Sequence, residues 1–259
     1  LGSGTSTGVP MIGCNCSVCQ SSKPANNRLR SSVFLHTSLG ARILIDTTPD
    51  LRTQLLREKI QHVDAVLVTH DHADHTHGMD DLRPLCRLQN QVIPVHCDLS
   101  TAEGLRKKFE YIFDRERVFT KERPVLGGGI PTLDLVIHEY GKNKIIGDEF
   151  TFYSLPHGHS RTTGFRHANL AYLVDCQAIP TEVLQELAQA KLDWLILDCV
   201  QPAPHQTHMG WEVARRTLEI IRPKQAGLIH MNHDWDHDEL TQKLKDHGMD
   251  WARPLRDGE

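Results

Sequence analysis

The sequence lacks long apolar runs and any excess of positive charge. No stretch of about 18 consecutive apolar residues occurs in the chain, so no membrane-spanning helix is predicted. The formal net charge is −4 at pH 7, which does not favour a nucleic-acid or acidic-membrane partner. No secretory signal segment is visible. We therefore expect a cytoplasmic protein that works without a membrane or nucleic-acid partner.

The start of the chain lacks a methionine and a first strand. It reads LGSGTSTG, a glycine-rich turn with no apolar strand leading into it, so we expect that a few residues precede this numbering. The turn also lacks the GK[ST] of a P-loop, which excludes that kind of nucleotide-phosphate site.

The cysteines do not form a complete disulfide framework. There are seven, so at least one is unpaired within the chain, and this usage fits a reducing compartment better than a secreted scaffold. Four stand alone, mostly in or beside apolar runs, and are expected to be buried or inert thiols: Cys86, Cys97, Cys176 and Cys199. The other three lie together near the N-terminus.

The composition is that of an ordinary globular protein. Of the 259 residues, 39% are apolar and 24% charged, and a chain of this length can bury a core without disulfides. Apolar periodicity predicts helices at 50–59, 99–113 (with Ser100 as N-cap), 179–191, 209–222 and 237–247. Strands are predicted at 41–46, 63–70, 92–97, 193–199 and 225–230 and within DLVIHEY, EFTFYSLP and NLAYLVDC, and VLGGGIPT (125–132) predicts a turn. The order predicts sheets covered by outer helices in one α/β domain, 1–259.

The stretch VTHDHADHTHG (68–78) carries metal-type ligands directly after an apolar strand. Imidazole and carboxylate suit zinc, iron or manganese. His70 and His72 are two apart, so in extended backbone they point the same way. If the chain turns after His72, Asp74 and His75 can face the same cavity. A solvated loop that happens to hold histidines is the alternative.

Further ligand types follow other predicted strands, which argues against that alternative. They are His157 and His159 in HGH, Asp175 in YLVDC and His230 in LIH. Ligands in α/β proteins commonly bind at strand ends. The sequence therefore predicts one metal-binding region built from several strand ends.

HDHADH resembles the HxHxDH signature of the metallo-β-lactamase superfamily, and SGTSTGVP and IDTTPD extend the resemblance. It implies a four-layer αββα sandwich with its site at one edge of two sheets. Carried over position by position, it assigns one metal ion to His70, His72 and His159, a second to Asp74, His75 and His230, and a bridging position to Asp175.

His157 is the alternative to His159. His77 is either a neighbour of the site or an exposed histidine. Asp46, after the strand ARILID, either fixes a histidine tautomer or caps a turn.

GCNCSVC places Cys14, Cys16 and Cys19 close enough to reach one ion, with a fourth ligand from elsewhere. A redox pair with a spare thiol, or three inert thiols, are the alternatives. We take His233 as the fourth ligand, since it lies three residues after His230. The CxCxxC motif narrows the resemblance to the phosphoribosyl cyclic phosphodiesterases and their relatives (the PhnP-like group), in which such a set holds a structural zinc.

The resemblance implies a hydrolase that cleaves a small phosphodiester, such as a phosphoribosyl 1,2-cyclic phosphate, by attack of a metal-bridging hydroxide. It implies two zinc or manganese ions in the active site, one structural zinc and a possible homodimer, with Asp74 and His208 as catalytic residues. A proton donor at His208 suits a departing alkoxide, although His205 competes for the role and His208 could instead belong to a helix cap.

Arg28, Arg30 and Arg161 are candidate phosphate contacts or ordinary surface arginines. A tRNA 3′-processing nuclease and a thioester or lactone hydrolase are the competing functions.

Overall fold

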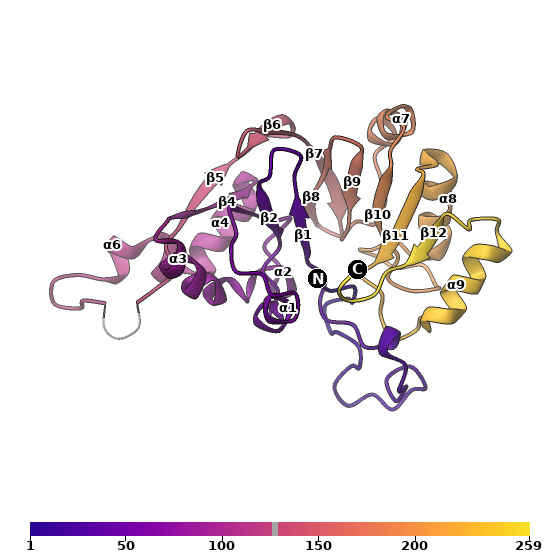
Figure 1. The fold of residues 1–259 in the computed structure, drawn as a ribbon, viewed down its shortest axis with the longest axis horizontal. Coiled ribbons are helices and arrows are strands. Elements are labelled where there is room, and N and C mark those ends of the chain that lie inside the picture. Colours follow the sequence, from indigo (N-terminus) through magenta and orange to yellow (C-terminus); the bar gives the residue numbers. More distant parts are fainter. Residues whose placement is uncertain (126–128) are drawn as a thin grey trace. The chain divides into compact units, whose positions relative to one another are not determined.

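The computed structural model describes residues 1–125 and 129–259 and contains two compact units (Figure 1). Unit 1 comprises Leu1–Ser31 and Glu149–Glu259, and unit 2 comprises Ser32–Asp148. The middle of the predicted turn VLGGGIPT lies outside the described residues. Among the described residues, no helix has both the length and the apolar character needed to cross a membrane. The prediction of one domain over 1–259 stays a prediction.

Unit 2 is built on a sheet of order β1-β2-β3-β4-β5. Only β1 and β2 pair antiparallel, and the later neighbours are parallel. The strands of this sheet are β1 (Val33–His36), β2 (Arg42–Ile45), β3 (Ala65–Leu67), β4 (Ile93–Cys97) and β5 (Leu133–Ile137). A further strand, β6 (Gly141–Ile145), lies in unit 2 but is not part of this sheet. The helices are α1 (Leu51–Arg57), α2 (Ala73–Thr76), α3 (Arg83–Gln89), α4 (Leu99–Lys108), α5 (Glu110–Phe113) and α6 (Arg115–Val118), with a 3-10 turn η2 (Met79–Leu82).

Unit 1 contains strands in the order β12-β11-β10-β9-β8-β7. The strands are β7 (Asp148–His157), β8 (Ser160–His167), β9 (Leu170–Leu173), β10 (Trp194–Asp198), β11 (Gln225–Ile229) and β12 (Ala252–Pro254). The helices are α7 (Thr181–Gln189), α8 (Trp211–Ile221) and α9 (His237–Asp246), with a 3-10 turn η1 (Pro24–Asn26). β7 to β9 pair antiparallel, and β9 to β12 are parallel.

The core of unit 1 follows from apolar spacing along its helices. In α8, Trp211, Ala214, Leu218 and Ile221 recur at helical spacing and all are buried in one cluster with residues of β9 to β11. Figure 1 shows α8 and α9 beside β11 and β12. Burying each large side chain stabilises the fold by about 1.5–3 kcal/mol. This packing holds β9 to β11, and therefore the residues that follow their ends, in fixed positions within unit 1.

Two local predictions about the helix over 99–113 were wrong, and the prediction for the four isolated cysteines is confirmed. The predicted helix over 99–113 is interrupted at Phe109, where φ is −127°, so it becomes α4 and α5. Its N-cap is Asp98 rather than Ser100, because the Asp98 side chain accepts a hydrogen bond from the Thr101 amide at 2.8 Å. The four isolated cysteines are buried, as predicted.

Two buried histidines make the stability of unit 2 depend on pH. His96 in β4 and His138, just after β5, are 7% and 6% exposed. Burial lowers the pKa of each to about 4. Both are neutral in the folded protein at pH values where the unfolded chain binds protons, below about 6.5. Their contribution to stability is therefore present above about pH 6.5 and is lost as the pH falls toward 4.

We expect the free energy of unfolding to fall by about 1–2 kcal/mol per histidine between pH 7 and 5. Urea unfolding at constant metal content measures it. His96→Leu and His138→Leu cannot titrate, so each variant should lose that much less over the same range. A decline equal to that of the wild type in both variants would contradict the assignment.

Candidate metal centres

The parallel strands of unit 1 bring three ligand-type residues to one sheet edge. β9, β10 and β11 are adjacent and parallel, with Leu173 opposite Leu197 and Asp198 opposite Ile229. Asp175, Asp198 and His230 lie at or just after the ends of these strands, and all are almost completely buried. Asp175 and His230 have φ of 57° and 62°. Non-glycine residues with such φ values are uncommon and gather at functional sites.

His208 joins this edge from the loop before α8. The four residues Asp175, Asp198, His208 and His230 offer ligand atoms that all lie within 4.8 Å of one another. His230 Nε2 is 3.0 Å from Asp175 Oδ1, and the His208 ring stacks on that of His230 at 4.6 Å. His208 Nδ1 lies 2.9 Å from Asp198 Oδ2. With its proton on Nδ1, His208 donates to this carboxylate, which fixes the orientation of the ring.

Asp198 is the residue that the sequence interpretation missed. Its carboxylate is fully buried and also accepts the Cys176 amide at 3.1 Å. The signal was present, because DWLILDC ends an apolar strand in Asp-Cys, as YLVDC does at Asp175. The same strand-end argument that selected Asp175 would have selected Asp198.

The structure favours His157 over the predicted His159. His157 is 4% exposed, its Nδ1 lies 2.9 Å from the Thr207 carbonyl oxygen, and its ring meets that of His208 edge-on at 4.9 Å. His159 is exposed. The reason is the tight turn between β7 and β8, in which Gly158 has φ of 60°. The turn breaks the extended geometry that would let either residue serve.

Unit 2 gathers its own ligand-type side chains at the end of β3. The His70 ring lies 4.5 Å from that of His72 and 4.4 Å from that of His75. His75 Nε2 is 3.2 Å from Asp74 Oδ2. The predicted turn after His72 is α2, which begins at Ala73 and carries Asp74 and His75 back toward His70. His77 is exposed, and its ring lies edge-on to Phe109.

Asp46 holds this cluster from the neighbouring strand end. It follows β2, which is parallel to β3, and its carboxylate is 2.7 Å from His75 Nδ1. It also accepts hydrogen bonds from the amide and hydroxyl of Thr69. Burial raises the pKa of Asp46, while His75 acts in the opposite direction. Of the two sequence interpretations, the structure supports the one in which Asp46 fixes a histidine tautomer.

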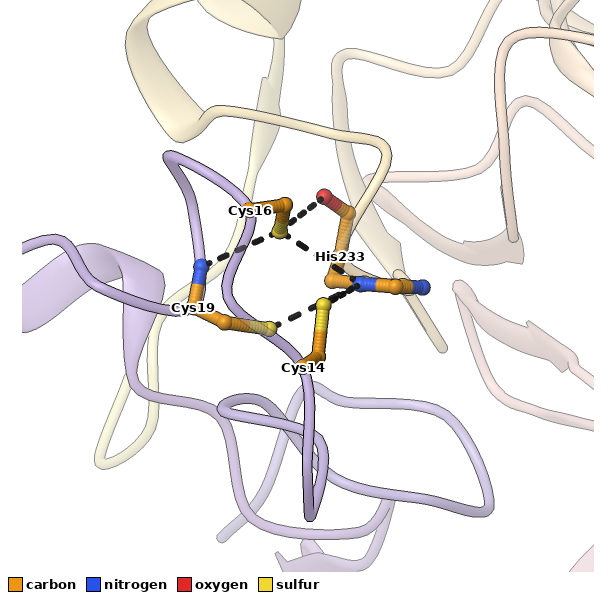
Figure 2. A group of neighbouring side chains, drawn as sticks. All are labelled: Cys14, Cys16, Cys19 and His233. Carbon is orange, nitrogen blue, oxygen red and sulfur yellow. Dashed lines mark hydrogen bonds between the residues drawn. The ribbon is translucent and has the colours of Figure 1, made fainter.

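The cysteine motif forms a second kind of cluster within unit 1. Cys14, Cys16 and Cys19 converge on His233 Nδ1, at 3.2, 3.5 and 3.6 Å from their sulfurs (Figure 2). With zinc bond lengths of about 2.0–2.3 Å, a tetrahedral site has edges of roughly 3.5–3.8 Å. The four atoms therefore fit a single zinc ion, both in chemistry and in spacing.

The sulfurs differ in acidity. The Cys19 amide donates to the Cys16 sulfur at 3.4 Å, and this contact lowers the pKa of Cys16 to about 6. Burial raises the pKa of Cys19 to about 11. The thiolate is the form of cysteine that binds metal. At neutral pH, Cys16 is therefore already largely in the form that binds a metal ion. A bound cation would then favour the thiolate at Cys19.

All three candidate phosphate contacts donate hydrogen bonds to carbonyl oxygens of the chain itself. The Arg28 guanidinium is buried and donates to the carbonyl oxygens of Asn232 and Trp235, on either side of His233. Its role is to hold the His233 loop. Arg30 Nε donates to the Ser6 carbonyl at 3.1 Å. Arg161 donates to the Ser154 carbonyl.

Comparison with known proteins shows the family to which the chain belongs. A model described as "Beta-lactamase superfamily domain" matches residues 41–231. An octanoyltransferase of Porphyromonas gingivalis is 33% identical over 235 residues, which are 90% of this chain and 45% of that protein. Coenzyme PQQ synthesis protein B of Klebsiella pneumoniae is 30% identical over 115 residues, 39% of this chain and 37% of that protein. The chain thus spans less than half the length of these curated relatives.

Solved structures agree. A diphosphatase from the PhnP family has a TM-score of 0.86 and 34% identity, with 100% of this chain and 93% of that chain covered. Zn²⁺-bound PqqB from Methylobacterium extorquens has a TM-score of 0.74 at 16% identity, with 100% and 97% covered, and supports the fold alone. The family model covers most of the chain, and nearly the whole PhnP-family structure is matched. The chain therefore belongs to the beta-lactamase superfamily and its PhnP-like group, with the mixed α/β fold that its HxHxDH and CxCxxC motifs predicted.

Proposed function

We propose that this protein is a metal-dependent phosphodiesterase that acts on a small cyclic phosphodiester such as a phosphoribosyl 1,2-cyclic phosphate. A diphosphate diester is the second candidate, on the likeness to the PhnP-family diphosphatase alone. The observation that carries the proposal is the Asp198–His208 pair beside Asp175 and His230. An alkoxide leaving group is strongly basic and needs a proton, which a positioned histidine can supply. A thiolate, with a pKa near 8.5, has much less need of one. A fixed histidine here therefore favours phosphodiester over thioester cleavage.

The donor sets suit divalent ions, zinc or manganese. Unit 2 offers His70, His72, Asp74 and His75, and unit 1 offers His157, Asp175 and His230. The division of these ligands between two ions is the one that the sequence resemblance implies, with His157 in place of His159. Bound ions would supply a nucleophile at neutral pH and polarise the phosphoryl oxygen. In unit 1, His208 delivers a proton to the leaving oxygen, and Asp198 holds the ring while it does so.

The cysteine cluster is proposed to hold a structural zinc. Three thiols and one imidazole make a closed ligand set, which is typical of structural rather than catalytic zinc. The ion would tie the loop that carries Cys14 to the loop that carries His233.

A substrate panel tests the function. The protein is loaded with Mn²⁺ or Zn²⁺ and assayed on phosphoribosyl 1,2-cyclic phosphate, an asymmetric diphosphate diester, precursor tRNA and an octanoyl thioester. The thioester is included because one relative is called an octanoyltransferase. We expect one or both phosphate esters to turn over with kcat/KM at least 100-fold above the other two substrates. Turnover of the thioester or the tRNA alone would overturn the proposal.

A further inference from the structure

The junction between α4 and α5 contacts the loop that carries the ligand-type side chains of unit 2, residues 70–77. Lys108, the last residue of α4, forms an ion pair with Asp71. The next residue, Phe109, interrupts the helix, and its ring meets that of His77 edge-on at 5.9 Å. The helix break therefore falls where the chain meets the metal-ligand loop, and the function proposed so far gives neither contact a role.

The same part of the chain approaches the loop closely at further points. Gly104 lies one helical turn before Lys108, and a Cβ at this position would come within 2.8 Å of the Asp71 Cβ. The approach therefore requires glycine, although glycine weakens the interior of a helix. Beyond the break, the Tyr111 hydroxyl donates to Asp80 Oδ1 at 3.1 Å. The helix and the segment after it are thus fitted to the loop near both of its ends.

Lys108 holds one peptide group of the loop. Its ammonium group donates to the Asp71 carbonyl oxygen and, at 2.7 Å, to Asp71 Oδ2. This carbonyl belongs to the peptide bond that joins Asp71 to His72, and a peptide group is planar. Holding its oxygen therefore limits the backbone rotations that decide where the His72 side chain points.

His72 differs from the other histidine ligands of the loop in its surroundings. His70 and His75 are buried. His75 is also fixed by Asp46, which lies 2.7 Å from its Nδ1, and by the Thr47 amide, which donates to its carbonyl oxygen at 2.7 Å. His72 is exposed, so packing contributes less to the orientation of its ring. The backbone that carries His72 must then supply more of that orientation.

The charge of Lys108 indicates that its role is geometric. A positive charge near a metal site disfavours metal binding by Coulomb repulsion. The ion pair contributes little to stability, because the side chains of Lys108 and Asp71 are 34% and 37% exposed and exposed pairs are weak. Neither attraction of a metal ion nor stability of the fold therefore accounts for a lysine at this position.

We propose that Lys108 is a positioning residue for the metal centre. By holding the peptide group between Asp71 and His72, it directs the His72 ring and so raises the affinity of the loop for a divalent ion. Gly104 permits this approach, and the contact between Phe109 and His77 supports the other end of the loop. The proposal rests on the metal site of the proposed function but not on its substrate, and it is judged by metal binding rather than by turnover.

Competition with a chelator for Zn²⁺ tests the role. We expect Lys108→Met to weaken binding of the more weakly held active-site ion about tenfold, as is usual when a residue that orients a ligand is lost. Coulomb repulsion alone predicts the opposite sign, because the substitution removes a positive charge. Lys108→Arg keeps a donor and should stay within threefold of the wild type. Lys107→Met, at an exposed neighbouring position on α4, removes the same charge and should leave the affinity unchanged.

Urea unfolding of the protein freed of its active-site ions separates positioning from a merely structural role. The midpoint for Lys108→Met should equal that of the wild type, and the ion of the cysteine cluster should stay bound. Unchanged or tighter binding of the active-site ions in Lys108→Met, or a loss of affinity accompanied by a lower midpoint, would overturn the proposal. If no phosphodiester is hydrolysed but Lys108→Met weakens metal binding as expected, the proposed function fails and the assignment of Lys108 stands.

Discussion

His208→Gln is expected to lower kcat on an alkyl phosphodiester by about 10²–10⁴-fold, the usual contribution of a general acid. The reason is geometric: Asp198 Oδ2 lies 2.9 Å from His208 Nδ1, and the His208 ring stacks on that of His230. On bis(p-nitrophenyl) phosphate the loss should be much smaller, because p-nitrophenolate is a weak base that leaves without a proton. Steady-state kinetics on the two substrates measures the difference.

Metal analysis of the same variant distinguishes two roles. His208 also belongs to the group of ligand atoms formed by Asp175, Asp198 and His230, so it could bind an ion instead. A proton donor can be removed without loss of metal, whereas removal of a ligand releases it. If the variant keeps its full metal content and loses much more kcat on the alkyl phosphodiester than on bis(p-nitrophenyl) phosphate, His208 is the general acid. Loss of an ion, with equal loss of rate on both substrates, would contradict it. His159→Gln, at an exposed position in the same unit, is the matched control.

The site residues that could be predicted from the sequence are those that directly follow an apolar strand. Ligand-type residues after apolar runs were recognisable at His70, Asp175 and His230, because parallel strands deliver their carboxyl ends to one edge. The choice between His157 and His159 was not recognisable, since it depends on the tight turn at Gly158. Period-two arguments hold only while the backbone stays extended.

Buried pairs were harder to foresee than ligands. Arg28 looked like a candidate for phosphate, yet it holds the carbonyls on either side of His233. Nothing in the local sequence shows that residue 28 meets residues 232 and 235, because the contact is set by the tertiary fold. A pocket lined by Thr5, Val200 and Asn232 could not be foreseen for the same reason, because these residues meet only in the folded chain.

Cys16→Ser is expected to release one metal ion per chain and to leave the others bound. Cys16 contributes one corner of a four-atom set whose other sulfurs, on Cys14 and Cys19, lie 3.2 and 3.6 Å from His233 Nδ1. Its pKa of about 6 also makes its thiolate more available at neutral pH than that of Cys19, whose pKa is about 11. A structural zinc contributes much of its binding free energy to folding. We therefore expect the free energy of unfolding to fall by at least about 3 kcal/mol, or roughly 6–12 °C in Tm.

The same substitution at a lone cysteine provides the comparison. Cys86 is buried and donates to the Thr132 carbonyl, a bond that a serine hydroxyl can replace, so Cys86→Ser should keep every metal ion and lose less stability. The buried apolar core of the loop around the cluster is small, with Val9, Val18 and Cys19 buried and Met11 packed against them. Loss of the ion should thus expose this loop to proteolysis before the rest of unit 1. If Cys16→Ser retains all its metal and its Tm, the cysteines are inert thiols, and the His233 loop is held by hydrogen bonds such as those from Arg28.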